Sequence, residues 1–376
     1  MPSAAHSAVR AEIADARRVV VKIGSSSLTG ANGHLDESAL GKLADVLAEA
    51  RQDGRDVVLV TSGSIAAGIG PLGLDRRPRD LEMQQATASV GQGILIAAYS
   101  AAFARHGLRV GQVLLTADDM VRRAHYGNAQ RALHRLLELG VVPIVNENDT
   151  VATDEIRFGD NDRLAALVAT VVHADAVVLL TDVDGLYTAA PGTAGATRIS
   201  IVTSMDELAG IDISRRGSAI GTGGMVTKLE AAAISTSSGI PVVLTSASSA
   251  REAMRGEDVG TAFVATGKHN GSRLAWLAHA ARPSGQLVLD AGAVRALRGG
   301  KASLLAAGVS AVRGEFEAGD PIELVSPDGA VVARGLASFA AHEVPAMLGL
   351  STAQLRDQLG PHFAHELVHI DALIVV

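Results

Sequence analysis

Two lysines stand beside segments suited to binding phosphate, in a chain that has only five lysines among 376 residues. Lys22 ends an apolar run and enters a Gly/Ser turn in VVVKIGSSS, and Lys228 closes the glycine-rich segment GTGGMVTK. Ammonium groups held in place suit the polyanionic tail of a nucleotide, because phosphoryl transfer depends on positioning and charge neutralisation. A solvated surface position is the ordinary alternative for any single lysine. The surrounding residues must therefore decide whether each lysine binds phosphate or is a solvated surface residue.

Acidic and amide side chains are interleaved between the two lysines, directly after an apolar run. They are Asn146, Glu147, Asn148, Asp149, Asp154, Glu155, Asp160, Asn161 and Asp162. A carboxylate can bind a substrate ammonium, an amide can bind a carboxylate, and a further carboxylate can hold lysines in place. An exposed polar loop is the alternative, but the interleaving and the apolar helix pattern that follows, LAALVATVV, favour a binding site. The spacing does not fit a calcium loop, because Leu164 and Ala165 follow with no glycine.

Small residues follow two of the apolar runs and could bring backbone amides close to an anion. In TSGSIAAG (61–68), Ser62 and Gly63 precede a predicted helix, whose first amides favour a carboxylate or phosphate. In KIGSSS, Gly24 and the serines could do the same beside Lys22. A plain connection between strand and helix is an equally good interpretation of both segments, so the sequence leaves them open.

Two further segments could contact a nucleotide. Thr181 and Asp182 follow an apolar run in TDVDGLY, although Asp184-Gly185 is also an ordinary turn signal. In the second segment, GTGGMVTK, backbone amides could surround phosphates, and Lys228 could contact the phosphoryl group that is transferred. This second segment consists of Thr222, Gly223, Gly224, Met225, Val226, Thr227 and Lys228. Its spacing differs from that of a Walker A sequence.

Two motif matches are rejected on their context. Gly68, Gly70 and Gly73 satisfy GxGxxG, but they fall at a predicted helix end and not between a strand and a helix. Residues 365–369 match HExxH, but the match runs into HIDALIVV, which is typical of a strand. Zinc binding would need both histidines on one helical face and a third ligand. We therefore predict no metal site in the protein itself.

The elements that must position these residues alternate between short apolar runs and longer helical patterns. The runs 19–23, 57–61, 110–116, 141–146, 176–181 and 241–245 predict strands covered on both faces, and the patterns 36–53, 80–106, 122–139, 161–173 and 225–238 predict helices. This alternation is typical of an α/β fold with a doubly wound, mostly parallel sheet. Ligands of such sheets bind beyond the carboxyl ends of the strands. Four of the candidate residues fall there: Lys22, Ser62, Asn146 and Asp182.

The composition changes near residue 283, where shorter strand patterns such as QLVLD and PIELV begin. We therefore predict a flexible N-terminal extension over 1–16, an α/β domain over 17–270, a linker over 271–282 and a small β-rich domain over 283–376. The last of these has six Lys and Arg residues against ten Asp and Glu residues.

Composition excludes several functional classes. The absence of cysteine excludes disulfides, thiolate metal sites and cysteine nucleophiles. A net charge of −7 argues against a general nucleic-acid or membrane-surface binder. The N-terminus has no apolar signal-peptide region, and no uninterrupted apolar run approaches the ~20 residues of a membrane span. The sequence predicts a soluble, cytoplasmic protein.

Six segments, taken in order, resemble the successive motifs of the glutamate 5-kinase family, within the amino acid kinase superfamily. They are VVVKIGSSSLT, VTSGSIAAG, PIVNENDTVAT, FGDNDRLAALVA, LLTDVDGLYT and GTGGMVTKLEAA. The resemblance covers residues 15–265, and the segment from 283 resembles the PUA domain that many bacterial members carry. It implies phosphorylation of the side-chain carboxylate of L-glutamate by ATP with Mg²⁺, as the first step of proline biosynthesis. It also implies proline as a feedback inhibitor and a homo-oligomer.

The resemblance further implies a role for each matching residue. Lys22 and Lys228 would neutralise the transferring phosphoryl group, and Asp162 would hold both lysines. Ser62, Asp149 and Asn161 would bind glutamate. Lys22, Thr181 and Asp182, with the segment 222–228, would bind ATP. These roles suit a reaction in which the substrate supplies the nucleophile and like charges must approach one another.

Two other functions remain open at this point. A related kinase could act on a different small acid, and an RNA-binding or RNA-modification module could use the PUA-like segment. The excess of acidic residues in that segment opposes contact with phosphate, so we predict a structural or regulatory role for it and no nucleic-acid partner.

Overall fold

The computed structural model describes residues 4–30, 34–116, 119–120, 123–152, 161–189, 193, 195–208, 224–267, 283–299 and 302–375. The chain divides into two compact units, Met1–Ser272 and Arg273–Val376. The predicted linker, 271–282, lies outside the described residues.

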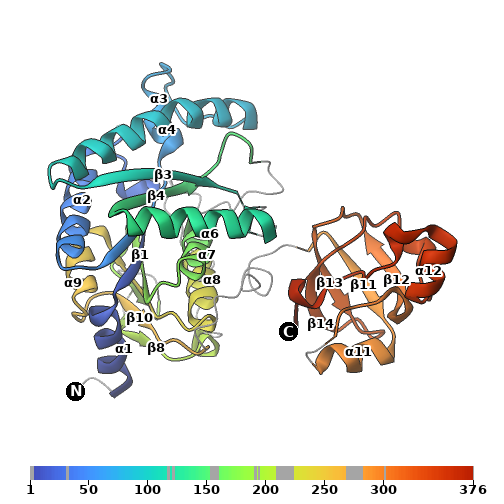
Figure 1. Ribbon diagram of the computed structural model, residues 1–376. Helices are drawn as coiled ribbons and strands as arrows, with labels where there is room; N and C mark the ends of the chain where they lie inside the picture. Colours follow the sequence, from blue (N-terminus) through green and yellow to red (C-terminus); the bar gives the residue numbers. More distant parts are fainter. Residues whose placement is uncertain are drawn as a thin grey trace. The chain divides into compact units, whose positions relative to one another are not determined.

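The first unit is built on an eight-stranded sheet in the order β3-β4-β2-β1-β5-β9-β10-β8 (Figure 1). All neighbouring strands are parallel except β9 and β10, which are antiparallel. The strands are β1 (Arg18–Ile23), β2 (Asp56–Val60), β3 (Arg109–Leu115), β4 (Val141–Glu147), β5 (Ala176–Thr181), β8 (Ile201–Val202), β9 (Val242–Ser246) and β10 (Thr261–Phe263). Strands β6 (Leu186–Tyr187) and β7 (Arg198–Ile199) form a separate two-stranded ribbon, which contacts β10 through the hydroxyl of Thr261.

Helices cover both faces of this sheet, which confirms the predicted doubly wound fold. Helices α1, α2, α4 and α9 share one hydrophobic core with β1, β2, β4 and β5. On the other side, α7 packs on β1 and β5, α6 on β4, and α8 on β9. The α-helices of this unit whose bounds the described residues give are α1 (Ala4–Asp15), α2 (Glu37–Gln52), α3 (Ser64–Ile69), α4 (Leu81–Ala104), α6 (Arg123–Glu138), α7 (Asn161–Val171), α8 (Met225–Ser237) and α9 (Ala250–Met254).

Local sequence signals account for where the long helices begin. Asp36 caps α2 by accepting hydrogen bonds from the amides of Ser38 and Ala39, and Asp80 caps α4 through the amide of Met83. The strands form where apolar residues run without interruption, because both faces of the sheet are covered. β5 is buried at every position.

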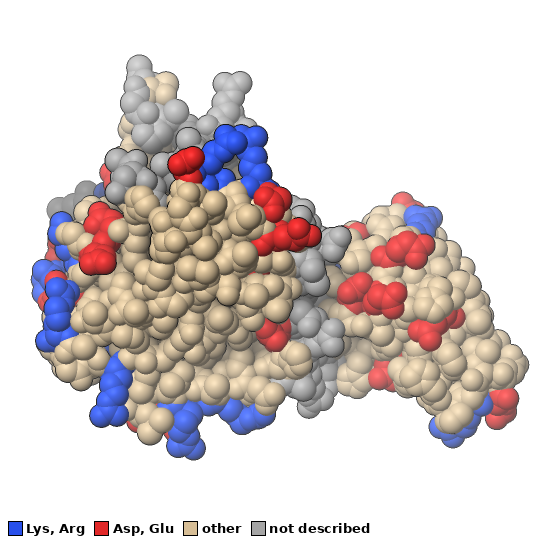
Figure 2. All heavy atoms as spheres, turned by 90° about the horizontal axis from the view of Figure 1, so that it is seen from above, with Lys and Arg blue, Asp and Glu red and all other residues tan. Residues whose placement is uncertain are grey.

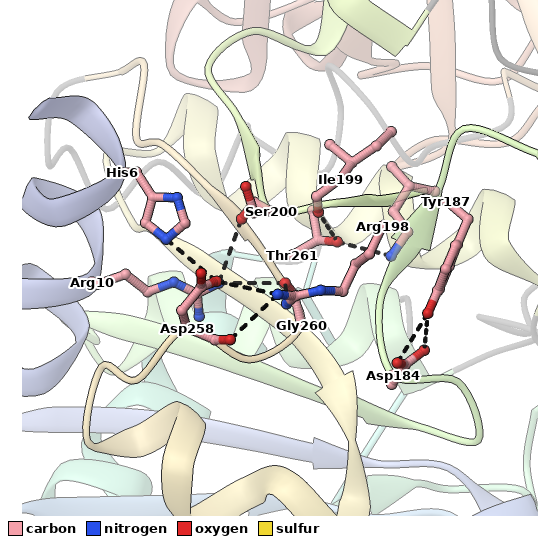
Figure 3. Close-up of polar contacts among 11 residues, drawn as sticks. His6, Arg10, Asp184, Tyr187, Arg198, Ile199, Ser200, Asp258, Gly260 and Thr261 are labelled. Carbon is pink, nitrogen blue, oxygen red and sulfur yellow. Dashed lines mark hydrogen bonds and ion pairs between the residues drawn. The ribbon is translucent and has the colours of Figure 1, made fainter. Parts of the chain in front are cut away.

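Helix α1 differs from the expected flexible extension, because residues 4–15 fold against the sheet. Val9 and Ile13 join the main core. Arg10 donates hydrogen bonds of 3.4 Å to the carbonyls of Ser200 and Gly260, and Nε2 of His6 lies 3.4 Å from Oδ1 of Asp258 (Figure 3). The helix is therefore held by polar contacts as well as by apolar burial.

Helices α3 and α4 pack unusually closely, through two glycines. A Cβ atom on Gly91 would lie 1.8 Å from the carbonyl oxygen of Ser64, and one on Gly68 would lie 2.1 Å from that of Thr87. Helix α3 ends at Ile69 with Gly70 as its C-cap, so the rejected GxGxxG match does fall at a helix end. Among the described residues, α4 has the length and composition of a possible membrane span, but Thr87, Leu95, Tyr99 and Phe103 on its inner face are buried.

The second unit contains a five-stranded sheet in the order β12-β11-β13-β14-β15, which confirms the predicted small β-rich domain. Its elements are β11 (Gly285–Leu289), α11 (Ala291–Arg298), β12 (Val309–Gly314), β13 (Pro321–Val325), β14 (Val331–Leu336), α12 (Thr352–Leu359) and β15 (Leu373–Val375). The HExxH match forms no α-helix, and Val368 instead pairs with Leu304 in a β-bridge. Within the described residues, no group of three or more His, Asp or Glu side chains is arranged to hold a metal ion.

Candidate active site

The candidate site lies at the carboxyl ends of four adjacent strands, β4, β2, β1 and β5. Asn146 and Glu147 end β4, Thr61 and Ser62 follow β2, and Thr181 ends β5. Lys22 is the penultimate residue of β1, between β2 and β5. Parallel strands bring these ends to the same edge of the sheet, as expected for ligand binding in such folds.

Lys22 and Lys228 are both bound to Asp162. Nζ of Lys22 lies 2.5 Å from Oδ1 of Asp162, and Nζ of Lys228 lies 3.0 Å from Oδ2. The three side chains are buried, with exposures of 2%, 10% and 0% for Lys22, Lys228 and Asp162. Charges buried to this extent require close partners, because desolvation is costly. One carboxylate therefore sets the separation of two ammonium groups.

The secondary structure around this trio explains how it is held. Asp162 stands in the first turn of α7, where the helix dipole favours a negative charge. Lys228 stands near the start of α8, where the same dipole disfavours a cation, so its contact with Asp162 offsets an unfavourable position. The hydroxyl of Thr227 lies 3.3 Å from Oδ2 of Asp162 and 2.9 Å from the carbonyl oxygen of Gly224, the N-cap residue of α8, and can donate its one hydrogen to either. The start of α8 is thus fastened to the start of α7.

Asn161 links three segments of the site through its side-chain amide. Its Nδ2 lies 2.5 Å from the carbonyl oxygen of Thr61, 3.0 Å from Oγ of Ser62 and 2.7 Å from Oδ1 of Asn146. Its own Oδ1 is buried and has no hydrogen-bond partner in the part of the chain that the structure describes. Buried polar groups are normally paired, so an exception calls for a functional explanation.

Asp149 is joined to the other side of the same loop by Ser64. Oγ of Ser64 donates a 2.8 Å hydrogen bond to Oδ2 of Asp149. Gly63, just before α3, has φ 107°, a left-handed conformation that favours glycine. Gly63 of TSGSIAAG is thus required by the turn that directs Ser62 and Ser64 to the site.

Thr181 and Asp182 lie at the end of β5, and the hydroxyl of Thr181 donates a 2.9 Å hydrogen bond to Asp182. Gly224 is the N-cap of α8, and Met225 and Val226 begin the helix, with Val226 exposed. The predicted positions Thr222 and Gly223 lie outside the described residues.

Helix α4 supplies contacts that the sequence analysis did not predict. Nδ2 of Asn146 donates a 2.7 Å hydrogen bond to Oε1 of Gln92. The hydroxyl of Tyr99 lies 2.8 Å from that of Thr61, and burial raises the pKa of this phenol, which keeps it protonated. Ser64 was missed as well. Its place two residues after Ser62 was an available signal, whereas nothing in the sequence near Gln92 or Tyr99 pointed to the site.

Comparison with known proteins places both units in families. Residues 17–246 match the amino acid kinase family, and residues 285–359 match the PUA domain. A glutamate 5-kinase from Streptomyces coelicolor is 59% identical over 98% of each chain, and one from Bifidobacterium longum is 56% identical over the whole of each chain. A carbamate kinase from Giardia lamblia bound to AMP-PNP shares the fold, with a TM-score of 0.50, 14% identity, and coverage of 68% of this chain and 99% of that one.

The fold agrees with the amino acid kinase family, and the similarity to the glutamate 5-kinases extends over nearly the full length of both chains. The chain belongs to the amino acid kinase family and, within it, to the glutamate 5-kinases.

Proposed function

We propose that this enzyme transfers the γ-phosphoryl group of ATP to the side-chain carboxylate of L-glutamate. The product would be L-glutamyl 5-phosphate, made in the first step of proline biosynthesis. The observation that carries the proposal is the pair of buried ammonium groups bound to Asp162, in a chain whose full-length relatives are glutamate 5-kinases.

Lys22 and Lys228 are proposed to neutralise the phosphoryl group during transfer. The attacking carboxylate and the γ-phosphate are both anionic, so their approach requires positive charge that is already in place. Asp162 cannot be the attacking group or a general base while it holds both lysines. Its proposed role is to fix their positions, which spares the reaction the cost of ordering them.

Ser62, Asp149 and Asn161 are proposed to bind glutamate. Asn161 uses its Nδ2 within the protein, which leaves Oδ1 as its acceptor for a ligand. An acceptor suits the α-ammonium group of glutamate, as does the carboxylate of Asp149. The hydroxyl of Ser62 and the backbone near Gly63 would suit a carboxylate.

Thr181, Asp182 and the segment 222–228 are proposed to bind ATP, with Lys22 and Lys228 at its phosphates. ATP would enter as its magnesium complex, because Mg²⁺ in such enzymes is held largely by substrate phosphates. The proposal draws support from the carbamate kinase of the same fold, which binds an ATP analogue.

The test is hydroxamate formation with ATP, Mg²⁺ and hydroxylamine, because hydroxylamine traps an acyl phosphate. We expect hydroxamate with L-glutamate and little with aspartate or N-acetylglutamate. Carbamate and UMP, whose products do not give a hydroxamate, are compared by acceptor-dependent release of ADP, and little release is expected with either. Turnover of one of these acids without turnover of glutamate would overturn the assignment and favour the related kinase.

We further propose that the chain forms a homo-oligomer through the outer face of α4. Met83, Val90 and Ile94 are exposed there, and Ala86, Ala97 and Ala101 share the stripe at helical spacing. Viewed from above, over α3 and α4, this face of the first unit is largely free of charged residues (Figure 2). An exposed apolar face of this kind is typical of a protein interface.

Sedimentation tests the oligomer directly. Ile94→Glu should lower the sedimentation coefficient at micromolar concentration, while Val331→Glu, at an exposed valine of the second unit, should not. If the wild-type protein sediments as a monomer, the proposed homo-oligomer is wrong.

Three other expectations also belong to this proposal. Proline should inhibit glutamate phosphorylation, which an inhibition assay at fixed ATP would measure. The PUA-like unit should not bind structured RNA, since its acidic residues outnumber its basic ones. Filter binding at low salt tests this, and retention of RNA would contradict it. The enzyme is expected to act in the cytoplasm.

A further inference from the structure

Gln92 lies on the inner side of α4, next to the glycine that allows α3 to approach. Within the described part of the chain it makes no hydrogen bond to the residues proposed to bind glutamate, yet it accepts one from Asn146, which in turn accepts one from Asn161. We propose that Gln92 is a positioning residue for the glutamate site, acting through Asn146 to fix the orientation of the Asn161 amide. This inference rests on the proposed binding of glutamate by Asn161.

The orientation of Asn146 is determined by a backbone group. The amide of Glu147 donates a 2.9 Å hydrogen bond to Oδ1 of Asn146. A backbone N–H can only donate, so the oxygen of the Asn146 amide must face it. Nδ2 of Asn146 then faces the other way, where Oε1 of Gln92 accepts its hydrogen bond at 2.7 Å.

The orientation of Asn161 follows from the same reasoning. The carbonyl oxygen of Thr61 can only accept, and so can Oδ1 of Asn146 once its direction is fixed. Both lie within 2.7 Å of the same atom of Asn161, which must therefore be Nδ2. Rotating the Asn161 amide by half a turn would place its Oδ1 against the carbonyl oxygen of Thr61 and Oδ1 of Asn146, neither of which can donate. Its Oδ1 is thus held in one direction as an acceptor.

Gln92 is the outermost member of this chain of amides, and the only one that α4 contributes. Asn146 and Asn161 are 1% and 6% exposed, so neither can exchange its partner readily for bulk water. Without the acceptor of Gln92, Nδ2 of Asn146 loses its partner and the Asn146 side chain is free to shift. Asn161 then loses one of the two groups that define its direction, and the site loses a prearranged acceptor.

The experiment compares three variants of α4. Gln92→Leu removes the acceptor with little change in volume, Gln92→Glu keeps an acceptor oxygen, and Gln84→Leu alters a glutamine of the same helix that donates to the carbonyl of Arg79. We expect Gln92→Leu to raise KM for glutamate about fivefold or more, with KM for ATP changed by less than about twofold. Gln92→Glu and Gln84→Leu should stay close to wild type.

A double-mutant cycle separates positioning from general destabilisation. In an Asn161→Ala background, Gln92→Leu should raise KM for glutamate by less than about twofold, because the group on which it acts is gone. Equal effects in both backgrounds, or an unchanged KM in a folded Gln92→Leu enzyme, would overturn the proposal. If Gln92→Leu fails to fold, Gln92→Asn withdraws the acceptor by one methylene and must show the same selective rise. A wild-type enzyme that does not phosphorylate glutamate would instead refute the proposed function.

Discussion

Lys22 and Lys228 are bound to different oxygens of one buried carboxylate, that of Asp162, at 2.5 and 3.0 Å. Lys22 comes from the central strand β1 and Lys228 from α8, on one face of the sheet. The distance between the two ammonium groups is consequently set by a single side chain. This makes their spacing a property of the folded core, and a change at Asp162 should disturb both cations together.

Replacing Lys228 by Ala should lower kcat by roughly 10²-fold or more, as the loss of a prearranged charge stabiliser does. Asp162→Asn should have a similar effect, because it frees both lysines without removing either. Steady-state kinetics with glutamate and ATP measure this, and Lys42→Ala, at an exposed lysine of α2, is the control. An unchanged kcat with a raised KM would mean that Lys228 only binds substrate in the ground state.

Two glycines of α4 should respond oppositely to alanine. A Cβ atom at Gly91 would strike the carbonyl of Ser64 at 1.8 Å, whereas one at Gly93 meets nothing within 4 Å. Gly91→Ala should therefore lower the free energy of unfolding by about 1–3 kcal/mol, and it should raise KM for glutamate by displacing Ser64 from Asp149. Gly93→Ala should raise the free energy of unfolding by about 0.5–1 kcal/mol. Urea denaturation compares the two, and equal effects would contradict the close packing of α3 on α4.

The contacts of α1 predict an asymmetry between Arg10 and Asp258. Burial lowers the pKa of the Arg10 guanidinium against the opposing effect of Asp258, which indicates that its desolvation is costly. Nε and Nη1 of Arg10 also have no hydrogen-bond partner within the described ranges. Arg10→Met should therefore change the free energy of unfolding by less than about 1 kcal/mol.

Asp258→Ala should be more harmful, although this carboxylate is 58% exposed. Its loss leaves Arg10 and Arg198 without the negative charge that lies between them (Figure 3). We expect the free energy of unfolding to fall by about 1–2 kcal/mol, less than for a fully buried pair because solvent screens the site. Urea denaturation of both variants tests this, and a larger loss in Arg10→Met than in Asp258→Ala would refute it.

Asp119 should contribute to stability in a manner that depends on pH. Burial favours its neutral form, but hydrogen bonds from the amide and hydroxyl of Thr116 and the contact with His125 outweigh that effect, so the pKa of Asp119 is lowered. A lowered pKa stabilises the fold at pH values above the unfolded pKa of about 3.9, and this contribution is lost as the pH falls through the folded pKa. The stability difference between wild type and Asp119→Asn should therefore be present at pH 7 and shrink below about pH 4.

Chemical denaturation across this pH range gives the comparison. Asp75→Asn, which changes an exposed carboxylate, serves as the control. A difference between wild type and Asp119→Asn that grows as the pH falls would contradict the direction of the pKa shift.

The sequence by itself predicted the elements of the first unit closely, because a parallel sheet covered on both faces requires uninterrupted apolar strands. The runs 141–146 and 176–181 correspond to β4 and β5 almost residue for residue. The resemblance of its motifs to the glutamate 5-kinase family also brought Lys22, Asp162 and Lys228 into one hypothesis. The expected position of the strand ends at one edge of the sheet agreed with it for Lys22.

Apolar periodicity did not predict helix α1. Its buried positions have helical spacing but include two polar residues: His6, Val9, Arg10 and Ile13. Apolar periodicity detects a buried face only when that face is apolar. Here the partners of the polar residues are carbonyls and a carboxylate nearly 200 residues or more along the chain.

The same reason explains why the sequence did not indicate a role for Gln92 or Ser64. A side chain that supports a site through one contact with another side chain leaves no trace in local spacing, and its importance depends on which helix packs against which strand end. Motif order and apolar periodicity thus determined the family, the fold and the charged centre. Only the tertiary structure decided which oxygen of Asp162 each lysine binds and which way Asn161 faces, because these depend on contacts between segments distant in the sequence.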